Sequence, residues 1–314
     1  MVVSTLSTVS KRVKSLTARR RRVGEFGFLD TLVFLGPILI FIIVLYGTLL
    51  WTIYVSLTDW KTIQANYTLT GLKWYKFLIA QPQFWVDIQN NLKWLVLGVV
   101  PTVILSILLA YLLEMAPLPA AESYIRTLIL YPVAMSFIVT GTIWSFLYEP
   151  NKGVFNTLFH MAGIKSPFVY VNNPATATYW LILIFIWQYL GFSVIIVQSS
   201  FRTSELQEMV EAATIDGASK MRALISVILP NIRGGLLILV SLLLINSLKI
   251  FDIVYIVTFS GPGISTDVLS MNMWTTFFQQ HLVSAGAGLG VIIFLLAFIL
   301  VIPYTLYAFN KWFE

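Results

Sequence analysis

The chain has 314 residues, of which 58% are hydrophobic and only 11% carry a formal charge, whereas soluble domains carry about 25% charged residues. Its mean hydropathy is +0.84. This composition excludes an ordinary water-soluble fold and predicts an all-α, polytopic membrane protein. Cysteine is absent, which excludes disulfides, thiolate metal sites and cysteine nucleophiles. His160 and His281 are far apart in the sequence, so we expect them in loops or interfaces and predict no metal site.

Six segments are long and apolar enough to cross a hydrocarbon core of about 30 Å. Because lipid cannot satisfy free backbone groups, each segment should be a transmembrane helix. The six segments are residues 32–57, 92–113, 128–147, 179–201, 236–257 and 287–309.

The distribution of basic residues predicts the orientation of these helices. Residues 1–28 form a basic tail with seven Lys or Arg. If the segments alternate in direction, thirteen Lys or Arg fall on the side of the tail and five on the other side. This bias predicts that both termini are cytoplasmic, N-in and C-in. The long first apolar segment lacks a small-residue cleavage pattern, which favours an uncleaved helix over a secretory signal.

Three features are expected on the outer side. Residues 70–91 mix aromatic and charged side chains, which is typical of a helix lying in the headgroup plane. The run Ser260-Gly261-Pro262-Gly263 predicts a turn. Small residues at the start of the sixth segment should let two helices pack closely; these are Gly286, Gly288 and Gly290.

The loop of residues 202–235, between the fourth and fifth segments, has a strong helical pattern. Ser204 followed by Gln207 forms a capping box, which predicts a helix from Glu205. Gly217 predicts a helix stop or sharp bend, and a second helical piece should end near Leu229-Pro230. An apolar stripe on the first helix should comprise Leu206, Met209, Val210 and Ala213. The stripe leaves another face for Glu208, Glu211 and Ala212.

This loop resembles the EAA loop of binding-protein-dependent ABC importer permeases. The resemblance rests on the spacing of Glu211-Ala212-Ala213, Asp216-Gly217-Ala218 and Ile228-Leu229-Pro230. Further segments are similar to permeases of the maltose-type carbohydrate family, first-permease type: residues 34–60, 91–114, 126–156 and 251–263. The sequence departs from many relatives at Gly234, where they have a second proline, and at Ser260, where they have glycine.

The resemblance implies an ABC type I importer permease fold over residues 29–314, with residues 202–235 as the coupling loop. In that family the loop docks into a cytoplasmic ATPase subunit. Glu211 would then pair with a basic residue of the ATPase, Ala212 and Ala213 would form the close-packing face, and Gly217 would fix the bend. The remaining coupling residues would be Asp216, Leu229 and Pro230. The alternative is a helical hairpin that stabilises its own bundle.

The resemblance also implies the partners of the chain. These are a second permease subunit in a heterodimer, two ATP-binding subunits and an extracytoplasmic solute-binding protein, at the cell inner membrane. The sequence contains no G-x-x-x-x-G-K-[ST] phosphate-binding loop, and no nucleophile elbow or zinc-protease motif. We therefore expect a transport subunit without enzymatic activity or a cofactor of its own, while ATP and Mg bind to the ATPase subunits. No nucleic-acid binding is expected.

Polar residues within the apolar segments are candidates for the substrate pathway, because charges inside a bilayer are costly. In the fifth segment the polar residues recur every three positions and should share one helical face; they are Asn246, Lys249, Asp252 and Tyr255. They either line a water-filled path or include a structural Lys249–Asp252 pair. In the fourth segment the stretch with Gln188, Gly191 and Ser193 resembles the substrate-facing stretch of the family.

These observations predict a permease that imports a carbohydrate, meaning a sugar, oligosaccharide or polyol. Permeases for glycerol phosphate, amino acids or peptides share the fold and remain an alternative. An ion-driven secondary transporter is a less favoured class, because it should show internal repeats and interrupted helices. A membrane-bound enzyme acting on lipid-linked sugars should show clustered acids at one membrane face, whereas the acids outside the 202–235 loop are scattered.

Overall fold

The computed structural model describes residues 28–114, 119–164, 171–201 and 204–310. The basic tail up to residue 27, and the basic residues Lys165, Arg202 and Lys311 used in predicting orientation, lie outside the described residues. The described residues contain no β-strand, and their only bridge is an isolated antiparallel one between Thr58 and Leu69. The chain divides into two compact units between Trp51 and Thr52. The second unit contains every candidate site residue.

The described part of the chain is helical, as predicted. Its helices are α2 (Phe28–Ser56), α3 (Lys73–Ala80), α4 (Pro82–Lys93), η1 (Trp94–Val99), α5 (Val100–Glu114), α6 (Pro119–Ala134), α7 (Phe137–Leu147), α8 (Val154–Met161), α9 (Ala177–Phe201), α10 (Ser204–Ile215), α11 (Lys220–Ala223), η2 (Leu224–Ile228), α12 (Leu229–Asn231), α13 (Arg233–Leu248), α14 (Asp252–Val257), α15 (Leu269–Trp274), η3 (Thr275–Gln279) and α16 (Val283–Asn310). The three η segments are single π-helical stretches that join or continue α-helices.

Four helical runs of the described residues are long and apolar enough to cross a membrane. They are residues 35–56, 82–114, 177–201 and 283–302. Two further helix pairs reach this length only if each bent pair forms one span. The structure therefore has four to six candidate spans. One bent pair, residues 123–147, coincides with the predicted third segment, whereas the other, residues 220–248, bends before the predicted fifth segment begins and overlaps only its first part.

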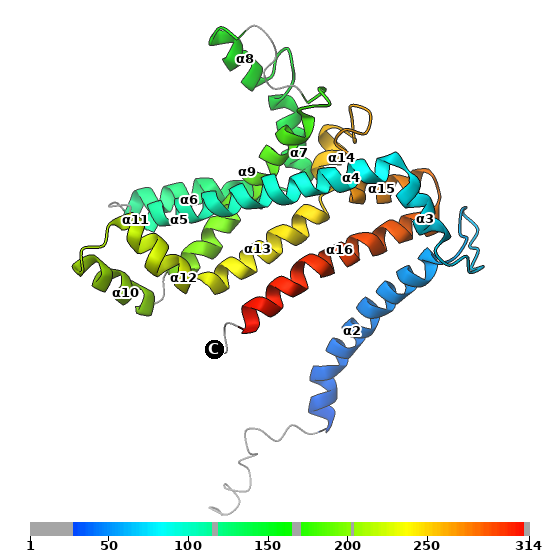
Figure 1. Cartoon of the computed structure of the whole chain (residues 1–314), viewed down its shortest axis with the longest axis horizontal. Coiled ribbons are helices and arrows are strands. Elements are labelled where there is room, and N and C mark those ends of the chain that lie inside the picture. Colours follow the sequence, from blue (N-terminus) through cyan, green and yellow to red (C-terminus); the bar gives the residue numbers. More distant parts are fainter. Residues whose placement is uncertain (1–27, 115–118, 165–170, 202–203, 311–314) are drawn as a thin grey trace, which may run out of the picture. The chain divides into compact units, whose positions relative to one another are not determined.

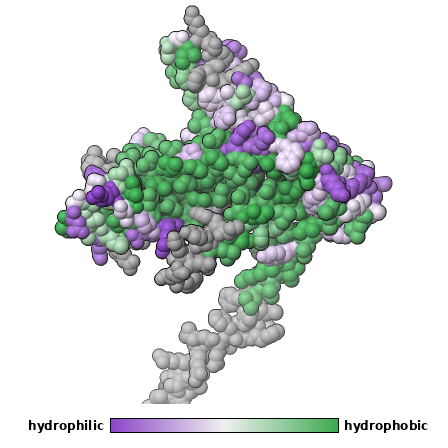
Figure 2. Space-filling view, in the orientation of Figure 1, coloured by the Kyte–Doolittle hydropathy of each residue, from purple (hydrophilic) through white to green (hydrophobic). Residues whose placement is uncertain are grey.

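The second unit is a helical bundle with polar elements at two opposite ends (Figure 1). α9 packs against α5 and α6, and α13 packs against α9 and α16. α10 to α12 lie at one end of the bundle, whereas α3, α14 and α15 lie at the other end. Figure 2 shows a broad apolar belt between these ends, with hydrophilic residues gathered over α10 and α11 and over the region around α3. This arrangement is what a bilayer requires of a spanning bundle.

The core of the bundle is formed by large side chains from helices that are distant in the sequence. Trp94 of η1 contacts Phe185 of α9 edge to face, with ring centroids 5.8 Å apart. Leu239, Ile253 and Met271 are fully buried in the same cluster. A second cluster joins α3 and α16 through Trp74, Leu78 and Leu289. These contacts hold the ends of the helices in fixed positions.

The second predicted segment begins ten residues too late. The helical run starts at Pro82 and continues without a break through α4, η1 and α5. The predicted headgroup-plane helix over residues 70–91 is therefore wrong as a single element, because only α3 stands apart. The polar residues of α4 suggested an interface helix, but Asp87, Asn90 and Asn91 are buried. All three are hydrogen-bonded to residues 248–272.

The third and fifth predicted segments are interrupted. α6 and α7 meet at an angle of 103°, where Pro132 lies inside the end of α6 and Ser136 caps α7 by accepting a hydrogen bond from the Val139 amide. A proline removes a backbone donor, and a Ser cap starts a new helix. In the fifth segment α13 ends at Leu248 and α14 starts at Asp252. The prediction of one continuous helix is wrong in both places.

The predicted turn and the predicted close packing at small residues are both confirmed. In the Ser260–Gly263 turn the Gly261 amide donates to the Thr258 carbonyl at 2.9 Å, and Gly263 has a φ of +64°. A Cβ on Gly286 would lie 2.7 Å from the Cβ of Phe277, and one on Gly288 would contact Leu78 at 3.4 Å. The small residues therefore allow α16 to pack closely against η3 and α3.

Candidate functional site

The first helix of the segment α10–α12, residues 204–231, ends at a glycine bend. α10 begins at Ser204, one residue before the predicted start. Gly217 has a φ of +81°. Its amide donates to the Thr214 carbonyl at 3.1 Å, and the Ala218 amide donates to the Ala213 carbonyl at 2.9 Å. This pair of bonds is a Schellman motif, which favours glycine because the left-handed conformation is strained for other residues. The predicted bend at Gly217 is confirmed.

α10 buries one face and exposes the other. Leu206 is buried, while Val210 and Ala213 are half-buried. Met209 is 48% exposed, so it does not belong to the predicted apolar stripe; it lies at the edge of the face that Leu206 defines. The exposed side chains include Glu208, Glu211, Ala212 and, beyond the helix, Asp216. The structure thus presents the predicted carboxylate and small residue to the outside.

The second half of the α10–α12 segment is tied firmly to the bundle. The Tyr111 hydroxyl of α5 donates to the Lys220 carbonyl at 2.7 Å. Leu224 and Ile228 are buried in the core cluster. Leu229 packs against the same cluster, whereas Pro230 is exposed at the start of α12. A force applied to α10 would therefore reach α5 and the core through short, rigid connections.

Gln188 lies at the break between α6 and α7. Its Nε2 donates to the carbonyls of Pro132 and Met135 at 2.7 and 3.0 Å, and its Oε1 accepts from the Thr140 hydroxyl at 2.6 Å. Both carbonyls belong to the bend, where they lack regular helical partners. The amide is only 4% exposed. This geometry indicates that Gln188 holds the bend in place.

Gly191 and Ser193 are buried on the same helix. A Cβ on Gly191 would lie 2.0 Å from the carbonyl oxygen of Ile129, so the backbones of α9 and α6 are in direct contact there. The Ser193 hydroxyl donates to the Tyr189 carbonyl of its own helix at 2.8 Å. The role of both residues in the pathway stays a prediction.

The four polar residues of the fifth segment do not share one helical face. Asn246 belongs to α13, Lys249 lies in the break, and Asp252 and Tyr255 belong to α14. Asn246 donates to the Leu242 carbonyl of its own helix at 2.8 Å. Within the part of the chain that the structure describes, Asp59 pairs with Lys61 and Lys73, and no ion pair joins Lys249 to Asp252. A Lys249–Asp252 pair is thus not formed in this structure, and the role of these residues in lining a path stays a prediction.

Tyr255 belongs to an aromatic cluster that the sequence analysis did not identify. Its ring centroid lies 5.2 Å from Phe251, 5.3 Å from Phe259 and 5.1 Å from Trp274. Trp274 also contacts Phe278 at 6.1 Å. Phe259 is 49% exposed and Phe278 is 60% exposed. The spacing of Phe251, Tyr255 and Phe259 gave a partial signal, but the contact with Trp274 depends on tertiary structure.

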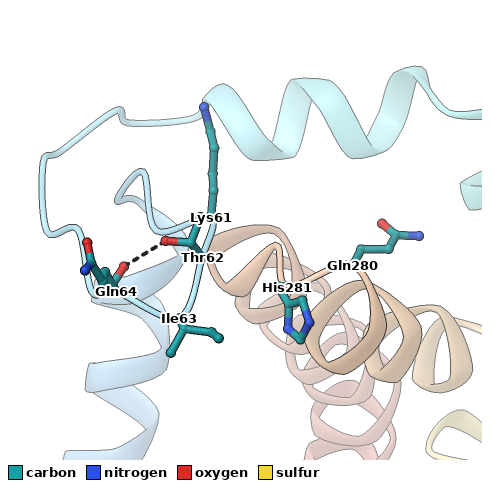
Figure 3. A pocket seen from close by; sticks show the side chains of 6 residues that line it. All are labelled: Lys61, Thr62, Ile63, Gln64, Gln280 and His281. Carbon is teal, nitrogen blue, oxygen red and sulfur yellow. Dashed lines mark hydrogen bonds between the residues drawn. The ribbon is translucent and has the colours of Figure 1, made fainter.

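A shallow pocket of about 440 Å³ opens at the end of the bundle opposite α10. Figure 3 shows that one wall comes from the loop after α2 and the other from the chain after η3. Thr62 donates to the Gln64 carbonyl at 3.3 Å and stiffens the loop. The six lining residues are Lys61, Thr62, Ile63, Gln64, Gln280 and His281. His281 thus lies in a loop as predicted, and the described residues contain no cluster of three side chains that could bind a metal.

Comparison with known sequences identifies the family of this chain. The chain is 36% identical over 283 residues to a probable ABC transporter permease of Pyrococcus horikoshii, covering 89% of this chain and 95% of the relative. It is 28% identical to the glucose import system permease of Saccharolobus solfataricus, covering 90% and 97%. It is 27% identical to the trehalose/maltose transport system permease of Thermococcus litoralis, covering 93% and 95%.

Solved structures agree on the fold. A chain in the crystal structure of a bacterial alginate ABC transporter, in complex with its alginate-bound periplasmic protein, matches with a TM-score of 0.76. It has 20% sequence identity, and the match covers 88% of this chain and 92% of that chain. No protein-family model matches. The extent and identity of the first match show that this chain belongs to the ABC transporter permeases.

The structure corrects the expectation, drawn from the sequence, that interrupted helices would be found only in a secondary transporter. The absence of interrupted helices counted against a secondary transporter, but the structure contains two bent helix pairs. Interrupted helices therefore do not separate the two classes. The sequence relatives do, because they are ABC transporter permeases over nearly the whole chain.

Proposed function

We propose that this chain is the membrane-spanning permease subunit of an ATP-driven ABC importer for a carbohydrate. The exposed α10 bend, with Glu211 and Ala212 on its outer face, is the observation that carries the coupling role. The carbohydrate substrate is supported by two relatives whose names specify glucose and trehalose/maltose. Each match covers at least 90% of both chains. The chain supplies the path, and partner subunits bind ATP and Mg.

The proposed assembly has a defined direction. With six spans, both termini and the α10–α12 segment would lie in the cytoplasm, and the pocket around Ile63 and His281 would lie on the outer side of the cell inner membrane. A second permease, two ATPase subunits and an extracytoplasmic binding protein complete the importer. Closure of the ATPases would move the α10–α12 segment and, through Tyr111 and the buried Leu224, shift the helices between inward-open and outward-open states. Such a change requires different contacts in the two states.

The substrate pathway is proposed to pass the broken end of the fifth span. Asp252 is half-buried at the start of α14, Lys249 is exposed in the break, and Tyr255 belongs to an aromatic cluster with exposed rings. Aromatic faces suit the C–H surfaces of a sugar, while charged and amide groups suit its hydroxyls. The remaining candidates are Asn246, Gln188, Gly191 and Ser193.

The coupling role is tested in the complete transporter, reconstituted in proteoliposomes. Glu211→Lys should reduce ATP-driven uptake at least tenfold and weaken co-purification of the ATPase, since disrupting a buried charge pair costs several kcal/mol and about 1.4 kcal/mol is tenfold. Glu208→Lys is the matched control, because Glu208 is exposed on the same helix and the change reverses the same charge. Equal uptake in both variants would remove Glu211 from the coupling contact.

The substrate class is tested separately with the co-purified binding protein. A thermal-shift screen of sugars, polyols, glycerol phosphate, amino acids and short peptides should give stabilisation with a sugar or polyol, because a ligand that binds the native state raises its stability. Stabilisation by a peptide or amino acid alone would contradict the carbohydrate assignment and leave the coupling role unaffected.

A further inference from the structure

A buried polar network joins α4 to the chain that follows the Ser260–Gly263 turn. Asn90 of α4 donates to the carbonyls of Ser265 and Asp267, both at 2.8 Å. Asn91 accepts from the Leu269 amide at 3.0 Å and donates to the Leu248 carbonyl at 3.3 Å. The network therefore connects α4, the C-terminal end of α13 and the start of α15.

Two buried carboxyl groups lie inside this network. Asp87 of α4 is 0% exposed and Asp267 is 1% exposed. Gln83 and Asn90, one turn on either side of Asp87 along α4, both donate to Asp267, which brings the two carboxyl groups together. Two carboxylates in one buried site cannot both carry a charge without a large electrostatic cost, so a proton or a cation must lie between them.

The donors around Asp267 indicate that it is the ionised partner. Its Oδ1 accepts from the Ser260 hydroxyl at 2.9 Å and from the Val268 amide at 3.0 Å, and its Oδ2 accepts from the Gln83 amide. Burial raises the pKa of Asp267, whereas hydrogen bonds from Gln83, Ser260 and the Val268 amide favour its charged form. Both oxygens therefore have donors, as a carboxylate requires.

Asp87 has the opposite environment. Its Oδ2 accepts from the Asn272 amide at 2.6 Å, but its Oδ1 is buried with no donor. Lys93, the nearest cation on α4, donates to Asn90 Oδ1 at 2.9 Å instead. An ionised Asp87 would leave one buried charged oxygen unsatisfied, whereas a protonated Asp87 would use that oxygen as a donor.

We propose that Asp87 and Asp267 form a proton-binding pair, in which one proton sits on Asp87 Oδ1 and is donated to the Asp267 carboxylate. The bound proton completes the link between α4 and residues 260–272. The same network satisfies the carbonyls at the break of the fifth span, through Asn91 to Leu248 and Ser270 to Ile250. The pair therefore fastens the outer end of the broken span, independently of the transported substrate.

The assignment of the proton predicts an asymmetry between two isosteric substitutions. In Asp87→Asn the new amide can donate to Asp267 while its oxygen accepts from Asn272, so the melting temperature of the purified complex should stay at the wild-type value. Asp267→Asn places a second donor against Gln83 and removes the acceptor for Asp87, so the melting temperature should fall by several degrees. Asp87→Ala removes the link altogether and should also lower it.

Infrared spectroscopy tests the proton directly, even if a variant fails to fold. At neutral pH the wild-type complex should show the C=O stretching band of a protonated carboxyl that shifts in D₂O, and Asp87→Asn should lose it. Absence of the band in the wild type, its persistence in Asp87→Asn, or equal destabilisation by Asp87→Asn and Asp87→Ala would overturn the proposal. A melting temperature that rises with Na⁺ at constant ionic strength would replace the proton with a cation and also overturn it.

Discussion

At Gly191 the backbones of α9 and α6 are in direct contact. Because an added Cβ would lie 2.0 Å from the Ile129 carbonyl oxygen, Gly191→Ala must push the two helices apart. We expect a loss of stability of about 1–3 kcal/mol, as found for overpacked sites, measured by thermal unfolding in detergent. Gly290→Ala in α16 is the control, since its nearest contact is Met273 Sδ at 3.4 Å. Equal stability in both variants would show that the backbones can separate.

Gln188 offers a second test at this scale, because its amide satisfies three groups at the α6–α7 break. Gln188→Leu leaves the Met135 carbonyl and the Thr140 hydroxyl without this partner and removes one of two donors to the Pro132 carbonyl. Each buried unsatisfied group costs about 1–3 kcal/mol, so the melting temperature should fall clearly. Gln89→Leu, the same change at an exposed position of α4, should leave it unchanged. Lost transport with unchanged stability would instead assign Gln188 to the pathway.

At the scale of elements, the apolar segments could be predicted from the sequence and their interruptions could not. Hydropathy shows whether a segment is apolar enough for the membrane, but it does not show whether the helical backbone hydrogen bonds are continuous along it. The break after Leu248 depends on donors from other helices, Asn91 and Ser270. The start of the second span at Pro82 likewise depends on partners for Asp87 that lie about 180 residues later. Ser136 after Pro132 was the one local signal of a break.

The candidate site residues also fall into two groups, those that local sequence predicts and those that depend on tertiary contacts. The bend of the α10–α12 segment follows from local chemistry, because a Schellman motif needs only nearby carbonyls and a glycine, and Gly217 was therefore identified from the sequence. The pathway residues were grouped on the assumption of one continuous helix, which the break at Lys249 removes. The contact of Tyr255 with Trp274 joins residues 19 positions apart across a turn. No helical periodicity extends over such a connection.

Gly217 provides a test of the α10–α12 bend as an element. Gly217→Val forces a β-branched residue to a φ of +81°, which costs at least about 1–2 kcal/mol and favours a different angle between α10 and α11. We expect ATP-driven uptake to fall while the complex still reaches the membrane. Gly217→Asn is the matched control, since Asn tolerates the left-handed region. Equal uptake in both variants would show that the angle of the bend does not matter for coupling.

For the whole molecule, the polar ends of the bundle and the belt between them restrict how it can lie in a bilayer. Hydrophilic residues gather over α10 and α11 at one end and around α3 at the other (Figure 2). The α9 helix leads from one end to the other, so we expect the α10–α12 segment and the pocket at Ile63 to lie on opposite sides of the membrane. The fold is compatible with two opposite orientations in the membrane. The distribution of basic residues favours the one with the α10–α12 segment in the cytoplasm.

The natural absence of cysteine makes this orientation directly measurable. Ile63 is 90% exposed and Gln207 is exposed on α10, so a single cysteine at either position should react with a membrane-impermeant maleimide wherever the reagent has access. We expect Ile63→Cys to be labelled in intact spheroplasts and Gln207→Cys only after permeabilisation. The cysteine-free parent controls for background. Labelling of Gln207→Cys in intact spheroplasts would reverse the topology and place the α10 bend out of reach of any cytoplasmic ATPase.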